Sequence, residues 1–154
     1  MKTVYRVLAY AIAALVAVQS AAIGYAVFAQ MNWIETGGTL DKAAFETGAP
    51  GTGAMIFHAL NAATVLLAAL ALLIVSFFAK IPQCVRWAVI VLACTVVQIV
   101  LGALHWSPLV SRLVSAIGAL HGAVALVLFG VAVMAAMRAR KPAAVEETVS
   151  ASVA

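Results

Sequence analysis

The sequence predicts an all-α integral membrane protein, a four-helix bundle. Hydrophobic residues occupy 66% of the 154 positions and charged residues only 9%, which is more apolar surface than one soluble core of this length can bury. An open β-sheet is excluded because its unpaired backbone groups cannot face lipid. Four apolar stretches are long enough for a helix rising 1.5 Å per residue to cross about 30 Å of hydrocarbon. They cover roughly 7–29, 54–79, 87–104 and 113–137.

The basic residues predict how this bundle is oriented. Only Lys42 and Arg112 lie in the first and third connections. The other basic residues lie at the amino end, in the second connection or at the carboxyl end, and are Lys2, Arg6, Lys80, Arg86, Arg138, Arg140 and Lys141. Because basic loops stay in the cytoplasm, both termini are expected to be cytoplasmic. The net charge of +4 then reflects topology and contact with anionic lipid, and no basic stripe suggests nucleic acid.

The first stretch is expected to be a retained helix rather than a signal peptide. Lys2 and Arg6 precede the apolar run, as in a signal sequence, but the run continues past Phe28. That is longer than the roughly 7–15 apolar residues of a signal peptide. The following connection, about 30–53, is rich in glycine, which argues against a packed domain. A short amphipathic turn is expected around Leu40 to Phe45.

The second and fourth stretches each contain one histidine, His58 and His121, and no other ionisable residue. Both histidines are expected in the outer leaflet, His58 about one turn and His121 about two turns into its helix. Imidazole is costly in hydrocarbon and needs a partner. Two histidines on separate helices of a small bundle can ligate haem iron from both faces, which satisfies both rings. We therefore predict that His58 and His121 bind haem b.

Three further residues are candidates for contact with this haem. Gly118 and Gly122 flank His121 in a small-xxx-small pattern, which allows either a flat macrocycle or another helix to approach closely. Arg112, at the outer start of the fourth helix, suits a haem propionate, although an interfacial arginine that snorkels is the alternative. Zinc fits less well, because the third histidine, His105, lies nearer the outer rim and the spans contain no acidic residue.

The first and third stretches contribute polar residues. Gln19 lies in the first, and Thr95, Gln98 and Gly102 form a polar edge along the third. Interhelical hydrogen bonding is the expected role of these side chains.

The remaining features are assigned no chemistry. Cys84 and Cys94 lack the spacing of a metal motif, so ordinary packing is expected. Residues 1–141 are expected to form the transmembrane domain, and 142–154 a disordered cytoplasmic tail.

Three short motifs extend this interpretation. They are Met55-Ile-Phe-His58, Gln98-Ile-Val-Leu-Gly102-Ala and Leu120-His121-Gly122-Ala123. Together they resemble one half of a haem A synthase, a duplicated bundle whose four-helix halves carry histidines on their second and fourth helices. The resemblance spans roughly 5–140 and implies that His58 and His121 are the axial haem ligands.

The chain also departs from that family. Met55 stands where the catalytic half has a glutamate, and Ala59 stands where an arginine often follows the histidine. The cysteine pair typical of the first outer loop is absent from 30–53, and there is only one bundle. Haem A synthase activity is therefore not expected, and the sequence does not favour an enzyme.

The resulting hypothesis is a small b-type haem protein of the cell membrane, with its site toward the extracytoplasmic side. Two strong ligands leave iron no open position, which favours electron transfer or redox sensing. Its partners would be a membrane redox complex or a second copy of the chain. The alternative is a cofactor-free accessory subunit of a larger membrane complex, in which His58 and His121 bond only to Gln98, Asn61 or backbone carbonyls.

Overall fold

The computed structural model of the protein describes residues 1–105 and 112–140. The four long helices in this part are long and apolar enough to cross a membrane, and they pack in a ring in which α1 contacts α3 and α5, and α4 contacts the same two helices. The expected all-α four-helix bundle is confirmed, while its orientation stays a prediction. The helices are α1 (Lys2–Glu35), α2 (Lys42–Glu46), α3 (Thr52–Ser76), α4 (Cys84–His105) and α5 (Val114–Arg138).

The first helix differs most from its expected bounds. It continues to Glu35 and has 34 residues, a length of about 51 Å where the hydrocarbon needs about 30 Å. The bounds of the other three long helices differ from expectation by at most three residues. The amphipathic turn expected near Leu40 is present as α2, with Asp41 as its N-cap. The expected tail, 142–154, lies outside the described residues.

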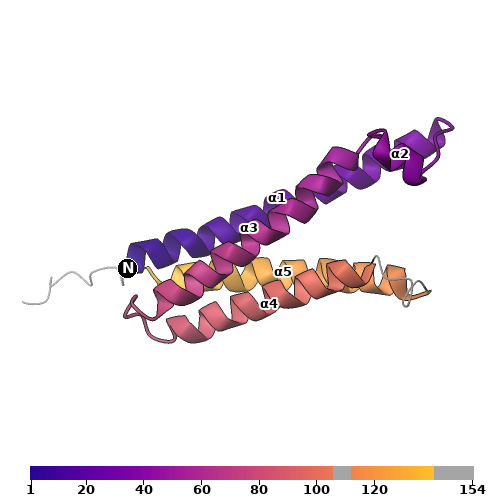
Figure 1. The fold of residues 1–154 in the computed structure, drawn as a ribbon. Helices are drawn as coiled ribbons and strands as arrows, with labels where there is room; N and C mark the ends of the chain where they lie inside the picture. Colours follow the sequence, from indigo (N-terminus) through magenta and orange to yellow (C-terminus); the bar gives the residue numbers. More distant parts are fainter. Residues whose placement is uncertain (106–111, 141–154) are drawn as a thin grey trace, which may run out of the picture.

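Among the described residues, all four long helices pack tightly together at only one end of the bundle. Figure 1 shows α1 and α3 diverging from α4 and α5 toward the end that carries α2, here called the α2 end. No residue of α5 before Leu128 is buried. The opposite end, here called the amino-terminal end, holds a core of mostly small side chains that let helices approach closely. Its fully buried members include Ala9, Ile12, Ala69, Leu72, Ala88, Val91, Ala132 and Ala135.

Two arginines connect helices at the amino-terminal end by contacting aromatic side chains. The Arg138 guanidinium carbon lies 4.6 Å from the centre of the Trp87 ring, within the range of a cation–π contact. Arg140 Nη2 donates to the Tyr10 hydroxyl oxygen at 3.1 Å. These two basic residues therefore join α5 to α4 and α1, in addition to marking the expected cytoplasmic side.

One glycine fixes the entry to α3. Gly51 is the N-cap of α3 and has φ +88°, a left-handed conformation that glycine adopts without steric cost. A Cβ at this position would lie 2.7 Å from the carbonyl oxygen of Ala26. Gly51 therefore allows the start of α3 to lie directly against α1 at the α2 end.

We expect Gly51→Ala to destabilise the pairing of α1 and α3. The added methyl group would have to displace the Ala26 backbone while its own backbone stays left-handed, at a cost of about 1–3 kcal/mol. The measurement is thermal unfolding of the protein in detergent. The matched control is Gly53→Ala, because a Cβ there would meet nothing within 4 Å. Equal melting temperatures for the two variants would contradict this role of Gly51.

Candidate functional site

The two histidines lie beside each other in the α2 half of the bundle. The ring centroids of His58 and His121 are 6.0 Å apart, with 54° between the ring planes. His58 follows Thr52, the first residue of α3, by six positions, and His121 follows Val114, the first of α5, by seven. Each histidine is therefore about two turns from the start of its helix. The fold brings together two residues that are 63 positions apart in the chain, at the same height along the axis of the bundle.

Gln19 of α1 holds His58 through two hydrogen bonds. Its side-chain Nε2 donates to the His58 carbonyl oxygen at 3.0 Å. In return, His58 Nδ1 lies 3.3 Å from the Gln19 carbonyl oxygen. Because a carbonyl oxygen can only accept, this bond requires the ring proton on Nδ1. The other nitrogen, Nε2, then keeps the lone pair with which a histidine binds a metal.

A similar contact joins His121 to α4. Gln98 Nε2 donates to the His121 carbonyl oxygen at 2.9 Å. One turn along α4, Gly102 lies against the His121 ring, where an added Cβ would be 3.5 Å from Cε1. The interhelical hydrogen bonding expected of Gln19 and Gln98 is confirmed. The accessory-subunit alternative already named Gln98 as a partner of the histidines, whereas the sequence did not indicate that Gln19 would reach His58. The same expectation is wrong for Thr95, whose hydroxyl donates to the Val91 carbonyl oxygen of its own helix.

The glycines flanking His121 border open space. A Cβ at Gly118 or Gly122 would meet no atom within 4 Å, and both residues are exposed. The alternative in which these glycines bring another helix of the bundle into close contact is therefore wrong for the helices that the structure describes. The face of α5 beside His121 remains accessible to a group from outside the chain.

The other sequence candidates are less closely associated with the histidines. Arg112 lies just before α5 and is exposed. Lys42, which as a basic residue of the first connection is a weaker candidate than Arg112 for a propionate, is exposed and pairs with Glu46 at 3.6 Å. The side chain of His105 is outside the description. No group of three or more His, Cys, Asp or Glu residues that could hold a metal occurs among the described residues. Zinc requires such a set, whereas haem iron requires only axial ligands from the protein.

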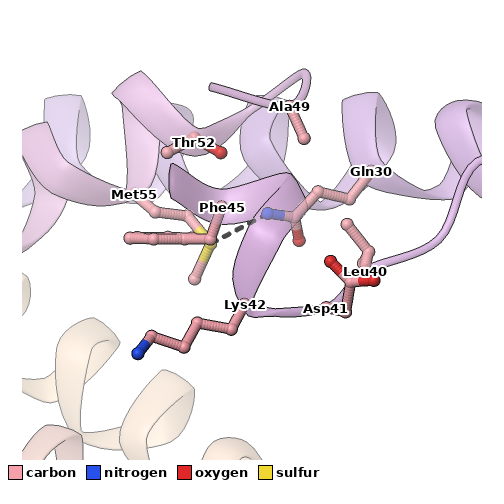
Figure 2. A pocket seen from close by; sticks show the side chains of 8 residues that line it. All are labelled: Gln30, Leu40, Asp41, Lys42, Phe45, Ala49, Thr52 and Met55. Carbon is pink, nitrogen blue, oxygen red and sulfur yellow. Dashed lines mark hydrogen bonds between the residues drawn. The ribbon is translucent and has the colours of Figure 1, made fainter. Parts of the chain in front are cut away.

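A separate pocket of about 500 Å³ lies at the α2 end. Figure 2 shows Gln30 and Met55 facing each other next to the ring of Phe45, and Gln30 Nε2 donates to Met55 Sδ at 3.0 Å. One Asp41 carboxylate oxygen accepts from the Ala44 N–H at 2.8 Å. The first of these bonds joins α1 to α3 and the second caps the start of α2, so both polar contacts serve the fold and we assign no ligand to the pocket. Its lining is Gln30, Leu40, Asp41, Lys42, Phe45, Ala49, Thr52 and Met55.

This pocket could not be inferred from the sequence. Its residues come from three helices and the connections between them, and the sequence places only Leu40 to Phe45 in a common amphipathic turn.

No protein-family model, curated protein or solved structure matches this chain. The resemblance to one half of a haem A synthase stays a prediction from its short motifs. The function proposed below is therefore based on the geometry of the site.

Because Gly118 and Gly122 face open space, we expect alanine at either position to be tolerated. Alanine favours the helix over glycine by up to about 1 kcal/mol, so Gly118→Ala and Gly122→Ala should melt at the wild-type temperature or slightly above it. The measurement is thermal unfolding of the cofactor-free protein in detergent. Lower melting temperatures, such as those expected for Gly51→Ala, would show that a helix packs on these glycines after all.

Proposed function

We propose that this protein is a small membrane haem b protein in which His58 and His121 are the axial iron ligands. The observation that carries the proposal is the 6.0 Å separation of the two ring centroids. A metal ion bound about 2 Å from a nitrogen of each imidazole separates the ring centres by roughly 6 Å. The spacing therefore suits one iron atom between the two rings.

The surroundings of the histidines support the same proposal. An axial histidine commonly donates its second ring N–H to a backbone carbonyl, which orients the ring and raises its basicity. The contact from His58 Nδ1 to the Gln19 carbonyl oxygen is of this kind. Gly118 and Gly122 leave space next to His121, which a flat macrocycle can use without displacing a helix. Arg112 is the proposed partner of a propionate.

The function that follows is one-electron transfer or redox sensing. A bound haem b would supply a one-electron redox centre. Two imidazoles from the protein leave no axial position for oxygen, which disfavours oxygen chemistry. Met55, one turn before His58, bonds to Gln30 and supplies no acid or base, so haem A synthesis is not proposed. The redox partner would be a membrane complex or a second copy of this chain.

A cofactor-free accessory subunit is the second candidate. It is favoured by the contact of His58 Nδ1 with the Gln19 carbonyl oxygen, because this bond gives the imidazole a polar partner without any cofactor. Large exposed apolar side chains also leave surface for lipid or for a neighbouring subunit, among them Phe28, Leu60, Leu67 and Leu126.

The first test is a reduced-minus-oxidised absorption spectrum of the full chain purified after expression with added haem. We expect the sharp bands of a low-spin haem, and we expect His58→Ala and His121→Ala each to lose them because one axial ligand is gone. Asn61→Ala is the control, since Asn61 lies on α3 one turn from His58 and, within the described part of the chain, its side chain donates to the Leu15 carbonyl oxygen rather than to a histidine. A colourless wild-type protein would reject haem binding in favour of the accessory subunit.

A second test fills the proposed haem space without touching either ligand. Gly118→Phe should fold, because its side chain enters open space, but it should bind haem at least about tenfold more weakly because the ring would occupy the space beside His121. The matched control is Gly130→Phe, on the same helix, where an added Cβ also meets nothing within 4 Å. Haem titration of both variants gives the comparison, and equal affinities would place the haem elsewhere.

A further inference from the structure

We infer that Gln19 and Gln98 form a matched pair of positioning residues, each of which holds one of the two imidazoles in place for the iron. The inference rests on the proposed function. It predicts that neither glutamine touches the haem, yet both determine how tightly haem binds and at what potential it is reduced.

The two contacts have the same geometry. In each, a glutamine Nε2 donates to the backbone carbonyl oxygen of a histidine on the next long helix, at 3.0 Å for Gln19 and 2.9 Å for Gln98. The separations along the chain differ, 39 residues against 23, because α2 and its connections lie within the first. The pairs α1–α3 and α4–α5 are thus two helical hairpins, each joined by the same kind of glutamine–histidine hydrogen bond. The rings of the two histidines lie next to each other between the hairpins.

A donor to the histidine carbonyl fixes the position of the histidine backbone. Within a helix this carbonyl oxygen already accepts from the N–H four residues further along. A second donor therefore has to come from a neighbouring helix, and that helix must have one particular height and rotation relative to the histidine helix. Each glutamine therefore fixes its histidine Cα relative to the adjacent helix. The ring keeps only its side-chain torsions, and for His58 the bond from Nδ1 to the Gln19 carbonyl oxygen restricts these as well.

Helix packing alone accounts poorly for Gln98. Its Oε1 is buried and has no hydrogen-bond partner in the described part of the chain, an arrangement that costs free energy. An apolar side chain would avoid this cost. Other polar residues of the bundle form hydrogen bonds that do not involve the histidines. Asn61 Nδ2 lies 3.5 Å from the Leu15 carbonyl oxygen, and Thr95 bonds to its own helix at Val91.

The experiment compares Gln19→Leu and Gln98→Leu with the matched control Asn61→Leu in the full chain loaded with haem b. Loss of a residue that orients a metal ligand typically weakens metal binding about 10–100-fold. We expect each glutamine variant to bind haem more weakly by this factor, and to change both the midpoint potential and the low-spin electron paramagnetic resonance signal. Asn61→Leu should lower the melting temperature and leave these three properties unchanged.

Two further variants cover the case in which leucine prevents folding. Gln19→Asn and Gln98→Asn keep the amide but shorten the side chain by one methylene, so we expect a smaller change of the same sign. A wild-type protein that binds no haem would overturn the proposed function together with this inference. Wild-type haem affinity, potential and resonance signal in all four glutamine variants would overturn this inference alone.

Discussion

Close packing of alanines at the amino-terminal end sets the geometry of the whole bundle. Ala9, Ala69, Ala88 and Ala132 come from the four long helices and are fully buried, and side chains this small let helix backbones approach closely. The larger, unburied residues of the other half do not continue this contact, so α1 and α3 diverge from α4 and α5 (Figure 1). On the diverging half, α5 borders open space at Gly118 and Gly122, next to His121.

The polar residues of the α2 half follow from a second constraint. Imidazole and amide groups inside an apolar bundle need hydrogen-bond partners, because lipid offers none. Gln19 and Gln98 each meet part of this need by donating to a histidine backbone carbonyl on the other helix of their hairpin, and the two histidine rings lie 6.0 Å apart. The same bonds hold the backbones of the two histidines, which links the packing of each hairpin to the position of a proposed ligand.

The two ends of the bundle are stabilised differently. At the amino-terminal end Arg138 and Arg140 contact aromatic side chains of α4 and α1, so residues that predict topology also connect helices. At the α2 end the chain turns through left-handed glycines, and Gly51 brings the start of α3 against α1. Because α1 is longer than a bilayer requires, α2 follows it outside the four apolar helices, while the pocket next to α2 reaches Thr52 and Met55 of α3. Neither His58 nor His121 lines this pocket.

The sequence by itself determined the number of long helices and, for α3, α4 and α5, their bounds to within three residues, because the thickness of hydrocarbon dictates how long an apolar helix must be. It also identified His58 and His121, since an ionisable group in such a stretch is conspicuous. It did not predict that α1 extends to Lys2 and Glu35, because polar and charged residues at both ends interrupt the apolar run without ending the helix. Only the tertiary structure decided that Gln19 and Gln98 reach the histidines and that Gly118 and Gly122 face open space. These contacts depend on which helices pair and on how each helix is rotated about its axis, and the hydrophobicity of the sequence determines neither the pairing nor the rotation.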